Sequence, residues 1–244
     1  MRVAVVSDIH GNRHAFEAVL EDLASAGADE VWCLGDLVGY GGEPDACVEL
    51  ARDRAAICLA GNHDLAVTGA LGIEEFSEGA AISARWTRKV IRRENLTFLE
   101  RLEPAGADSG IGLYHASPRD PIWEYVLSAP QATRCLDAAP QRVSLIGHSH
   151  VALAFRRAAK GEETAVSAAR PGDHANLEEG EWLLNPGSVG QPRDRDPRAA
   201  WLLLETEERR AEWRRIEYDV DGAAAAIRAA GLPDSLADRL GYGQ

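Results

Sequence analysis

The first third of the chain alternates between short apolar runs and segments with helical spacing. Residues 2–7, 30–34 and 55–60 are apolar runs of the kind that forms buried strands. After the first run, Asn12 can cap a helix in which apolar residues recur every three or four positions, and 44–53 repeats that spacing after the second. Strands that alternate with helices predict right-handed crossovers and a mainly parallel sheet.

Further along, the chain changes from alternating helices and strands to a series of strands. Short strands are predicted at 111–114, 143–146, 151–155, 164–167, 182–184, 199–204 and 212–216. Helices are predicted over 74–102, 129–138, 221–230 and 234–240. Short connections join the strands after residue 150, which indicates an antiparallel second sheet, and 168–180 has the composition of a loop. We expect a single α/β domain over 1–244, with two packed sheets flanked by helices.

The composition is that of an ordinary globular protein, with 45% hydrophobic and 27% charged residues. No apolar run is long enough to span a membrane, and Val3 to Val6 is too short for the core of a signal peptide. We therefore expect a cytoplasmic protein that does not bind membranes. The four cysteines lie apart in the sequence, and in a reducing compartment we expect small apolar core residues rather than disulfides.

The balance of charge disfavours one class of partner. With 26 Lys and Arg against 39 Asp and Glu, the formal net charge is -13. Nucleic acids are bound largely through basic residues that neutralise phosphates. Nucleic acid is therefore an unlikely partner, although bound divalent cations would offset part of the negative charge. The sequence does not indicate an oligomeric state.

Side chains that can hold metals follow the predicted strands at five places. They are Asp8 with His10, Asp36, Asn62 with His63 and Asp64, His115, and His148 with His150. Ligands collect at the carboxyl ends of parallel strands, and residues two positions apart in extended backbone point the same way. A single histidine is more often structural than a ligand. Here five of the seven histidines directly follow predicted strands, whereas His14 and His174 carry no such signal.

In their order along the chain, these segments resemble the motif set of the calcineurin-like metallophosphoesterases. The motifs are Asp8-x-His10, Gly35-Asp36, Gly61-Asn62-His63-Asp64, His115 and Gly147-His148-Ser149-His150. The family's last motif usually has Thr where this chain has Ser149. The segment Asn185 to Arg193 is similar to the small bacterial and archaeal phosphodiesterase branch. The resemblance implies a four-layer α/β/β/α sandwich of two mixed sheets.

The resemblance also implies two metal sites that share one carboxylate. Asp8, His10, Asp36 and His150 would hold one ion, and the bridging Asp36 with Asn62, His115 and His148 the other. Carboxylate, imidazole and amide ligands without thiolate suit transition metals better than Ca²⁺ or Mg²⁺. We expect two divalent transition-metal ions, with manganese favoured and iron, zinc, cobalt or nickel as alternatives.

By resemblance, the expected activity is the hydrolysis of a phosphate ester of a small molecule or nucleotide, with a phosphodiester favoured. A hydroxide that bridges the two ions would attack phosphorus in line. His63 would act as general acid and protonate the leaving alkoxide, and Asp64 would orient the His63 ring.

The chain also departs from the family pattern. In the protein phosphatase branch an Asp-Arg pair follows Gly-Asp and its arginine grips phosphate, but here Gly39 and Tyr40 stand at those positions. This disfavours a protein phosphatase. Tyr40 is a candidate to stack on the substrate or to form the pocket wall. Arg119 and Arg193 are candidates to contact phosphate, and each also has an ordinary interpretation as a surface arginine.

Two other classes of function remain open at this stage. Some proteins keep this fold as a binding scaffold and lose catalysis, but a scaffold can lose ligands and this chain retains the full set. A nuclease is the other alternative, although the negative charge and the lack of an additional domain for a DNA groove argue against it.

Overall fold

The computed structural model describes residues 1–244 and contains two six-stranded sheets. In spatial order, the first sheet consists of β3 (Ile57–Cys58), β2 (Glu30–Cys33), β1 (Arg2–Val6), β11 (Ala199–Glu205), β12 (Arg210–Ile216) and β9 (His174–Asn176). Strands β1, β2 and β3 are parallel, as the alternating sequence predicted. Strand β11 pairs antiparallel with β1, with Val3 opposite Leu204, and so the sheet is mixed.

The second sheet combines strands from the middle of the chain. In spatial order it consists of β4 (Ala105–Asp108), β5 (Ile111–Tyr114), β6 (Val143–Leu145), β10 (Glu181–Asn185), β7 (Leu153–Arg157) and β8 (Thr164–Ala168). Strands β5, β6 and β10 are parallel, and the remaining pairs are antiparallel. The expectation that the strands after residue 150 form a separate antiparallel sheet is therefore wrong. Three of them join β5 and β6, and three join the first sheet.

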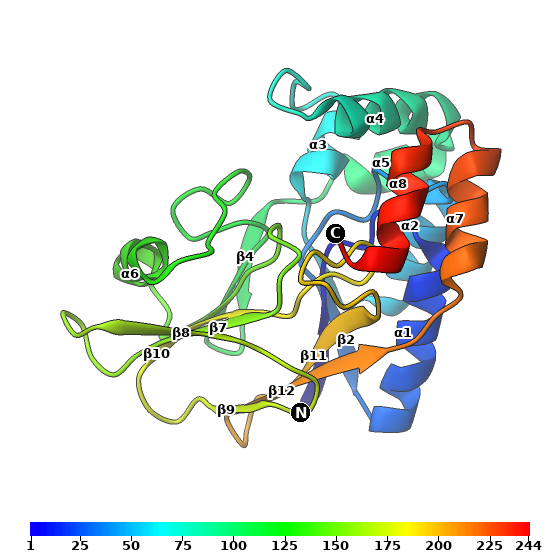
Figure 1. The fold of residues 1–244 in the computed structure, drawn as a ribbon. Coiled ribbons are helices and arrows are strands. Elements are labelled where there is room, and N and C mark those ends of the chain that lie inside the picture. The colour runs from blue at the N-terminus through cyan, green and yellow to red at the C-terminus, as the bar shows by residue number, and fades with distance from the viewer.

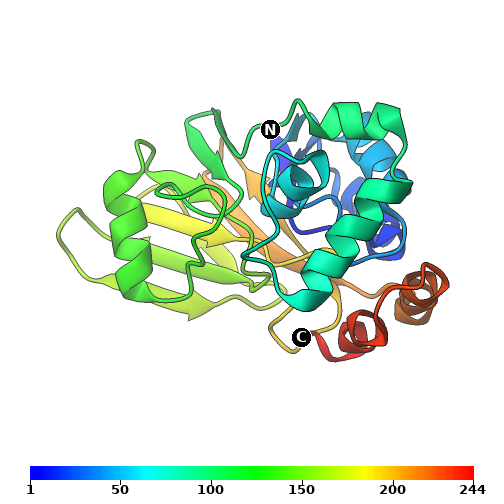
Figure 2. The same ribbon diagram turned by 90° about the horizontal axis from the view of Figure 1, so that it is seen from above.

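Eight α-helices and a short 3-10 turn complete the chain. They are α1 (Arg13–Ala26), α2 (Pro44–Arg54), α3 (Asn62–Thr68), α4 (Glu78–Val90), α5 (Arg93–Leu99), α6 (Ala129–Ala138), α7 (Val220–Ala229), α8 (Asp234–Asp238) and η1 (Arg239–Tyr242). Figures 1 and 2 show α6 on one side of the paired sheets and α1 and α2 on the other. No helix is both long enough and apolar enough to cross a bilayer.

The alternation of side chains along β1 explains the four layers. Val3 and Val5 pack into the apolar core between the two sheets, together with residues of β5, β6 and β10. Ala4 and Val6 point the other way and pack against α1 and α2. A third core joins α6 to the outer face of the second sheet. The predicted α/β/β/α arrangement is confirmed.

The segment 74–102 differs from its prediction as a single helix. It contains α4 and α5, separated at Ile91 and Arg92, whose ψ angles of 133° and 144° are extended. The Asp45 carboxylate on α2 accepts a hydrogen bond of 3.0 Å from the backbone N–H of Arg92. This contact with another helix stabilises the break. The sequence has no glycine or proline at this point, and so the break was not predicted.

Candidate metal centre

The loops that follow β1 and β2 run beside each other and extend the parallel pairing beyond the strands. The backbone N–H of Asp8 donates to the Gly35 carbonyl at 3.0 Å, and that of His10 donates to the Asp36 carbonyl at 2.9 Å. Asp8, His10 and Asp36 all have positive φ angles, between 52° and 56°. A non-glycine residue in this backbone region costs conformational free energy, and residues strained in this way are concentrated at functional sites. The paired loops thus present the three side chains to the same space.

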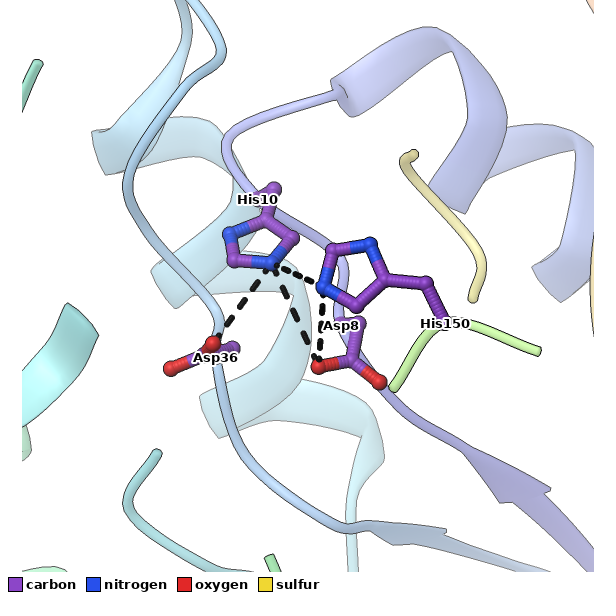
Figure 3. Close-up of side chains that lie close together, drawn as sticks. All are labelled: Asp8, His10, Asp36 and His150. Atoms are coloured by element: carbon purple, nitrogen blue, oxygen red, sulfur yellow. Dashed lines mark hydrogen bonds and ion pairs between the residues drawn. The ribbon is translucent and has the colours of Figure 1, made fainter. Parts of the chain in front are cut away.

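Four of the predicted ligands form a compact cluster (Figure 3). His10 Nε2 lies 3.5 Å from Asp36 Oδ2 and 4.0 Å from Asp8 Oδ1. His150 Nε2 lies 3.5 Å from Asp8 Oδ1 and 3.0 Å from His10 Nε2. All four side chains are buried. Two imidazole nitrogens and two carboxylates therefore converge on a single small volume.

A second cluster shares Asp36 with the first. Its possible ligand atoms come from Asp36, His115 and His148. His115 Nε2 lies 3.6 Å from Asp36 Oδ2 and 3.2 Å from the Asn62 side-chain oxygen. Asn62, at the start of α3, is thereby brought to the same place. The structure therefore brings together all seven side chains that the sequence nominated as ligands, with Asp36 between the two groups.

The other ring nitrogen of three histidines is fixed by the backbone. Nδ1 of His10 donates to the Val38 carbonyl at 3.0 Å, Nδ1 of His115 to the Leu34 carbonyl at 3.0 Å, and Nδ1 of His150 to the Gln191 carbonyl at 2.6 Å. A neutral imidazole that carries its proton on Nδ1 has a lone pair on Nε2. Each ring therefore turns a metal-binding nitrogen into the cluster.

The polar atoms within the cluster fit a bound cation. Asp8 Oδ1 and His148 Nε2 are buried and have no hydrogen-bond partner. Burial, followed by the neighbouring positive groups, lowers the pKa values of His10 and His150 well below the usual range, which keeps both rings neutral. The two Nε2 lone pairs then face each other across 3.0 Å, an arrangement that a divalent ion would stabilise and that hydrogen bonding alone does not explain.

The two buried carboxylates, Asp8 and Asp36, also fit a bound cation. Burial raises the pKa of Asp8 to about 7, and burial together with the charge of Asp64 raises the pKa of Asp36 well above its usual range. An anion removed from water is costly unless a positive group compensates it. Divalent ions between Asp8 and Asp36 would supply that compensation.

Asp64 has a different set of partners from the one expected. Its carboxylate accepts hydrogen bonds from the backbone N–H groups of Asp36, Leu37, Val38 and Gly61, at 2.8, 3.3, 3.1 and 2.9 Å. No hydrogen bond joins it to the His63 ring, whose Nδ1 is buried without a partner. Asp64 thus holds the backbone of two site loops together and does not hydrogen-bond to the His63 ring.

The segment from Asn185 to Gln191 braces the ligands from behind. The Asn185 side chain donates to the Gly147 carbonyl at 2.8 Å and to Ser149 Oγ at 3.0 Å. Ser188 Oγ donates to the Asp8 carbonyl at 2.8 Å, and the Gln191 carbonyl holds His150. The sequence drew attention to this segment only by resemblance. Its contacts show that it links the Asp8 loop with the loop that carries His148 and His150.

A pocket of about 380 Å³ opens over the two clusters. Its walls include Asp36, Asn62, His63, His148 and His150, the aromatic residues Tyr40, Phe76, Trp123 and Tyr125, and the basic residues Arg193 and Arg239. Tyr40 and Arg193, which the sequence suggested as substrate contacts, thus line the pocket. Arg119 is not part of the wall, and it pairs instead with Glu124 at 2.7 Å. Arg239, near the C-terminal end, carried no local sequence signal because only tertiary packing brings it to the pocket.

Comparisons with known proteins agree with this arrangement. The family model of the calcineurin-like phosphoesterase superfamily domain matches residues 1–209. An uncharacterised protein of Methanocaldococcus jannaschii is 36% identical over 99% of this chain and 98% of its own length. The crystal structure of a metallophosphoesterase from Sphaerobacter thermophilus is 39% identical and superposes with a TM-score of 0.91, over 100% of this chain and 99% of that one.

A more distant structure shares the fold. A hypothetical protein from Pyrococcus horikoshii superposes with a TM-score of 0.78 at 20% identity, over 100% of this chain and 98% of that one.

The two clusters at the strand ends and the match over residues 1–209 place this chain in a defined class: it belongs to the calcineurin-like phosphoesterase superfamily. Membership in this family implies a phosphate ester as substrate.

Proposed function

We propose that this protein is a dinuclear metal-dependent phosphoesterase, built as a single domain, that hydrolyses phosphodiesters of small molecules or nucleotides. The observation that carries the proposal is the pair of clusters that share Asp36, with the Nε2 atoms of His10 and His150 only 3.0 Å apart. Asp8, His10, Asp36 and His150 would hold one ion. Asp36, Asn62, His115 and His148 would hold the second.

Two divalent transition-metal ions, when bound, supply a nucleophile at neutral pH and offset the negative charge of a phosphate ester. The ligand set, in which imidazole predominates and thiolate is absent, supports manganese, iron, zinc, cobalt or nickel, with manganese favoured. The protein's part is to hold the ester in the pocket and to protonate the leaving oxygen.

His63 is the residue that we assign to this protonation. Its ring lies in the pocket wall and packs against Tyr40 and Phe76, with ring centres 4.5 and 4.7 Å away. Burial and the charge of Arg193 lower the pKa of His63 to about 3, so the ring is neutral in the free protein. The negative charge of a bound phosphate would oppose that shift and favour the imidazolium needed for proton donation.

The remaining substrate contacts follow from the pocket walls. Arg193 is half-buried. It lies next to the ligand clusters, because its backbone N–H donates to the His150 carbonyl at 3.0 Å. Its guanidinium lies over the Tyr40 ring at 5.7 Å, and we assign Arg193 to the phosphate oxygens and Tyr40 to the ester group. The ion pair between Arg119 and Glu124 gives no support to the earlier nomination of Arg119, which can act only if that pair opens.

The test is to remove metals with a chelator and return Mn, Fe, Zn, Co, Ni or Mg one at a time. Turnover of bis(p-nitrophenyl) phosphate, p-nitrophenyl phosphate and single-stranded DNA is then measured alongside metal content. We expect metal-restored hydrolysis, faster for the small diester than for the monoester, and none for DNA. Protein that binds two ions and hydrolyses none of these esters would contradict the proposal and favour a binding scaffold.

A further inference from the structure

Two aromatic side chains reach the pocket from one short segment between β5 and α6. Trp123 and Tyr125 both line the pocket wall, whereas Glu124 between them does not. The Glu124 carboxylate accepts a hydrogen bond of 2.6 Å from Ser117 Oγ and pairs with Arg119 at 2.7 Å. Glu124 is therefore anchored away from the pocket, and the rings on either side of it face the pocket.

Hydrogen bonds and packing fix this segment in place. The Asp120 carboxylate accepts hydrogen bonds from the backbone N–H groups of Ile122 and Trp123, both at 3.0 Å. Val126, directly after Tyr125, is buried in the apolar cluster beneath α6. A binding surface that is already ordered loses little conformational entropy when a ligand binds. The two rings are thus held in position for a ligand.

Tyr125 has one open ring face. Its ring centre lies 4.2 Å from that of His148, with 36° between the planes, so His148 covers one side of the ring. The side chain is nevertheless 42% exposed, because no other ring contacts it. A second planar ring can stack on an open aromatic face in an offset arrangement. Since His148 belongs to the second ligand cluster, a ring bound there would lie beside the proposed metal centre.

Trp123 forms the adjoining part of the same wall. It meets Phe76 at 86° and His148 at 77°, with ring centres 5.4 and 6.4 Å away, so neither ring lies parallel to the indole. Its indole N–H donates to no group of the chain, unlike those of four other tryptophans. Trp123 therefore offers the pocket both an aromatic surface and a hydrogen-bond donor.

Tyr40, on another part of the pocket wall, has no such open face. It is buried, and the Arg193 guanidinium lies over its ring at 5.7 Å. The ring centres of His10 and His63 lie 4.7 and 4.5 Å away. Stacking on a planar ligand therefore falls to Trp123 and Tyr125.

We propose that Trp123 and Tyr125 form a stacking subsite, and that the preferred substrates are phosphate esters that carry a planar aromatic group, either a nucleobase or an aryl ring. This inference rests on the proposed function, because it takes the scissile phosphate to lie at the ligand clusters. The pocket volume of about 380 Å³ lies within the range of small-molecule sites. Aromatic side chains bind bases of any sequence by stacking, since every base has a π face.

Calorimetry with the metal-loaded protein tests the subsite through two pairs of phosphates. Adenosine 5′-phosphate and ribose 5-phosphate differ in the base, and phenyl phosphate and cyclohexyl phosphate differ in the planarity of the ring. Titrations are restricted to times over which no inorganic phosphate appears. We expect the aromatic compound to bind about tenfold more tightly, the scale of one stacked base. A preference in the first pair assigns the subsite to a nucleobase, and a preference in the second pair alone assigns it to an aryl ring.

Substitution of the two rings by leucine keeps an apolar side chain and removes the aromatic face. Tyr125→Leu and Trp123→Leu should each reduce the binding ratio about threefold, the scale of a single aromatic pair. Tyr125 is exposed enough for its variant to fold. Tyr242→Leu is the matched control, because it makes the same change at a tyrosine that is 67% exposed and lies outside the pocket wall. Its ratio should equal that of the unmodified protein.

Equal binding within both pairs would overturn the subsite, and so would a preference that Tyr125→Leu and Trp123→Leu leave unchanged. Failure of the proposed function would appear separately, as absent metal-dependent turnover of bis(p-nitrophenyl) phosphate by the unmodified protein, whichever way the binding ratios fall.

Discussion

Asp36 Oδ1 accepts a hydrogen bond of 2.9 Å from the backbone N–H of His63, in the first turn of α3. The other carboxylate oxygen of Asp36 faces both His10 and His115. The residue that we assign to both ions therefore also anchors the helix that presents Asn62 and His63. Gly61 allows this contact, because a Cβ atom there would lie 1.9 Å from Asp36 Oδ1. Metal binding and the position of the proposed acid are thus coupled through one side chain.

The shared carboxylate gives the first prediction. Asp36→Asn should lower the affinity for both ions by at least about 100-fold. Even the loss of a residue that only supports a metal ligand lowers metal affinity by about 10–100-fold. The amide oxygen can still accept the hydrogen bond from His63, so the fold should persist. Asp8→Asn serves as the comparison, because Asp8 belongs only to the first cluster and its loss should remove one ion of the two. Metal analysis after dialysis would separate the variants, and two retained ions in Asp36→Asn would contradict bridging.

The second prediction concerns the role of His63 as acid. His63→Ala should leave metal content unchanged and slow the hydrolysis of alkyl esters by about 10²–10⁴-fold, the usual contribution of proton donation. Nitrophenyl esters should be slowed far less, because nitrophenolate leaves without a proton. The measurement is kcat for a series of diesters against the pKa of the leaving alcohol. An equal loss across the series would count against the assignment.

A third prediction tests the position of the His63 ring. Gly39 has φ +89°, and a Cβ atom there would lie 2.2 Å from His63 Nδ1. Gly39→Ala should therefore displace the ring and slow alkyl esters while both ions stay bound. Gly161→Ala is the matched control, with φ +91° and no atom within 4 Å of the added carbon. It carries the backbone strain of about 1–2 kcal/mol without the collision, and its kinetics should match the unmodified protein.

The fourth prediction concerns the brace behind the ligands. Asn185→Leu keeps the branched shape of the side chain but leaves the buried Gly187 N–H without its partner, and it removes the hydrogen bonds to the Gly147 carbonyl and to Ser149 Oγ. One unsatisfied buried N–H should cost about 1–3 kcal/mol of unfolding free energy. The loop with His148 and His150 should also bind metal about 10–100-fold more weakly. Urea denaturation and metal titration measure the two effects, and Asn176→Leu, on the exposed edge strand β9, is the control. Unchanged metal affinity would show that Asn185 supports only the fold.

Much of the candidate site follows from local sequence, because it depends on where each strand ends. The apolar run of residues 2–7 fixes a buried strand, and the polar residues directly after it, Asp8 and His10, must lie at its carboxyl end. The same holds for Asp36 after β2 and for His148 after β6. Parallel strands bring these ends to one edge. Helix α6 was likewise predicted with its observed bounds, since its own spacing of apolar residues defines it.

The tertiary structure decided what local spacing does not encode. Strand β11 pairs with β1 rather than with a separate sheet, because an apolar run does not specify its hydrogen-bonding partner. Strands β4 and β9 were missed, since both are short and depend on neighbouring strands. Asp64 bonds to backbone groups that its own sequence context does not reveal. The pocket excludes Arg119 and includes Arg239 for the same reason: contacts between distant segments place a side chain, and only the folded chain sets those contacts.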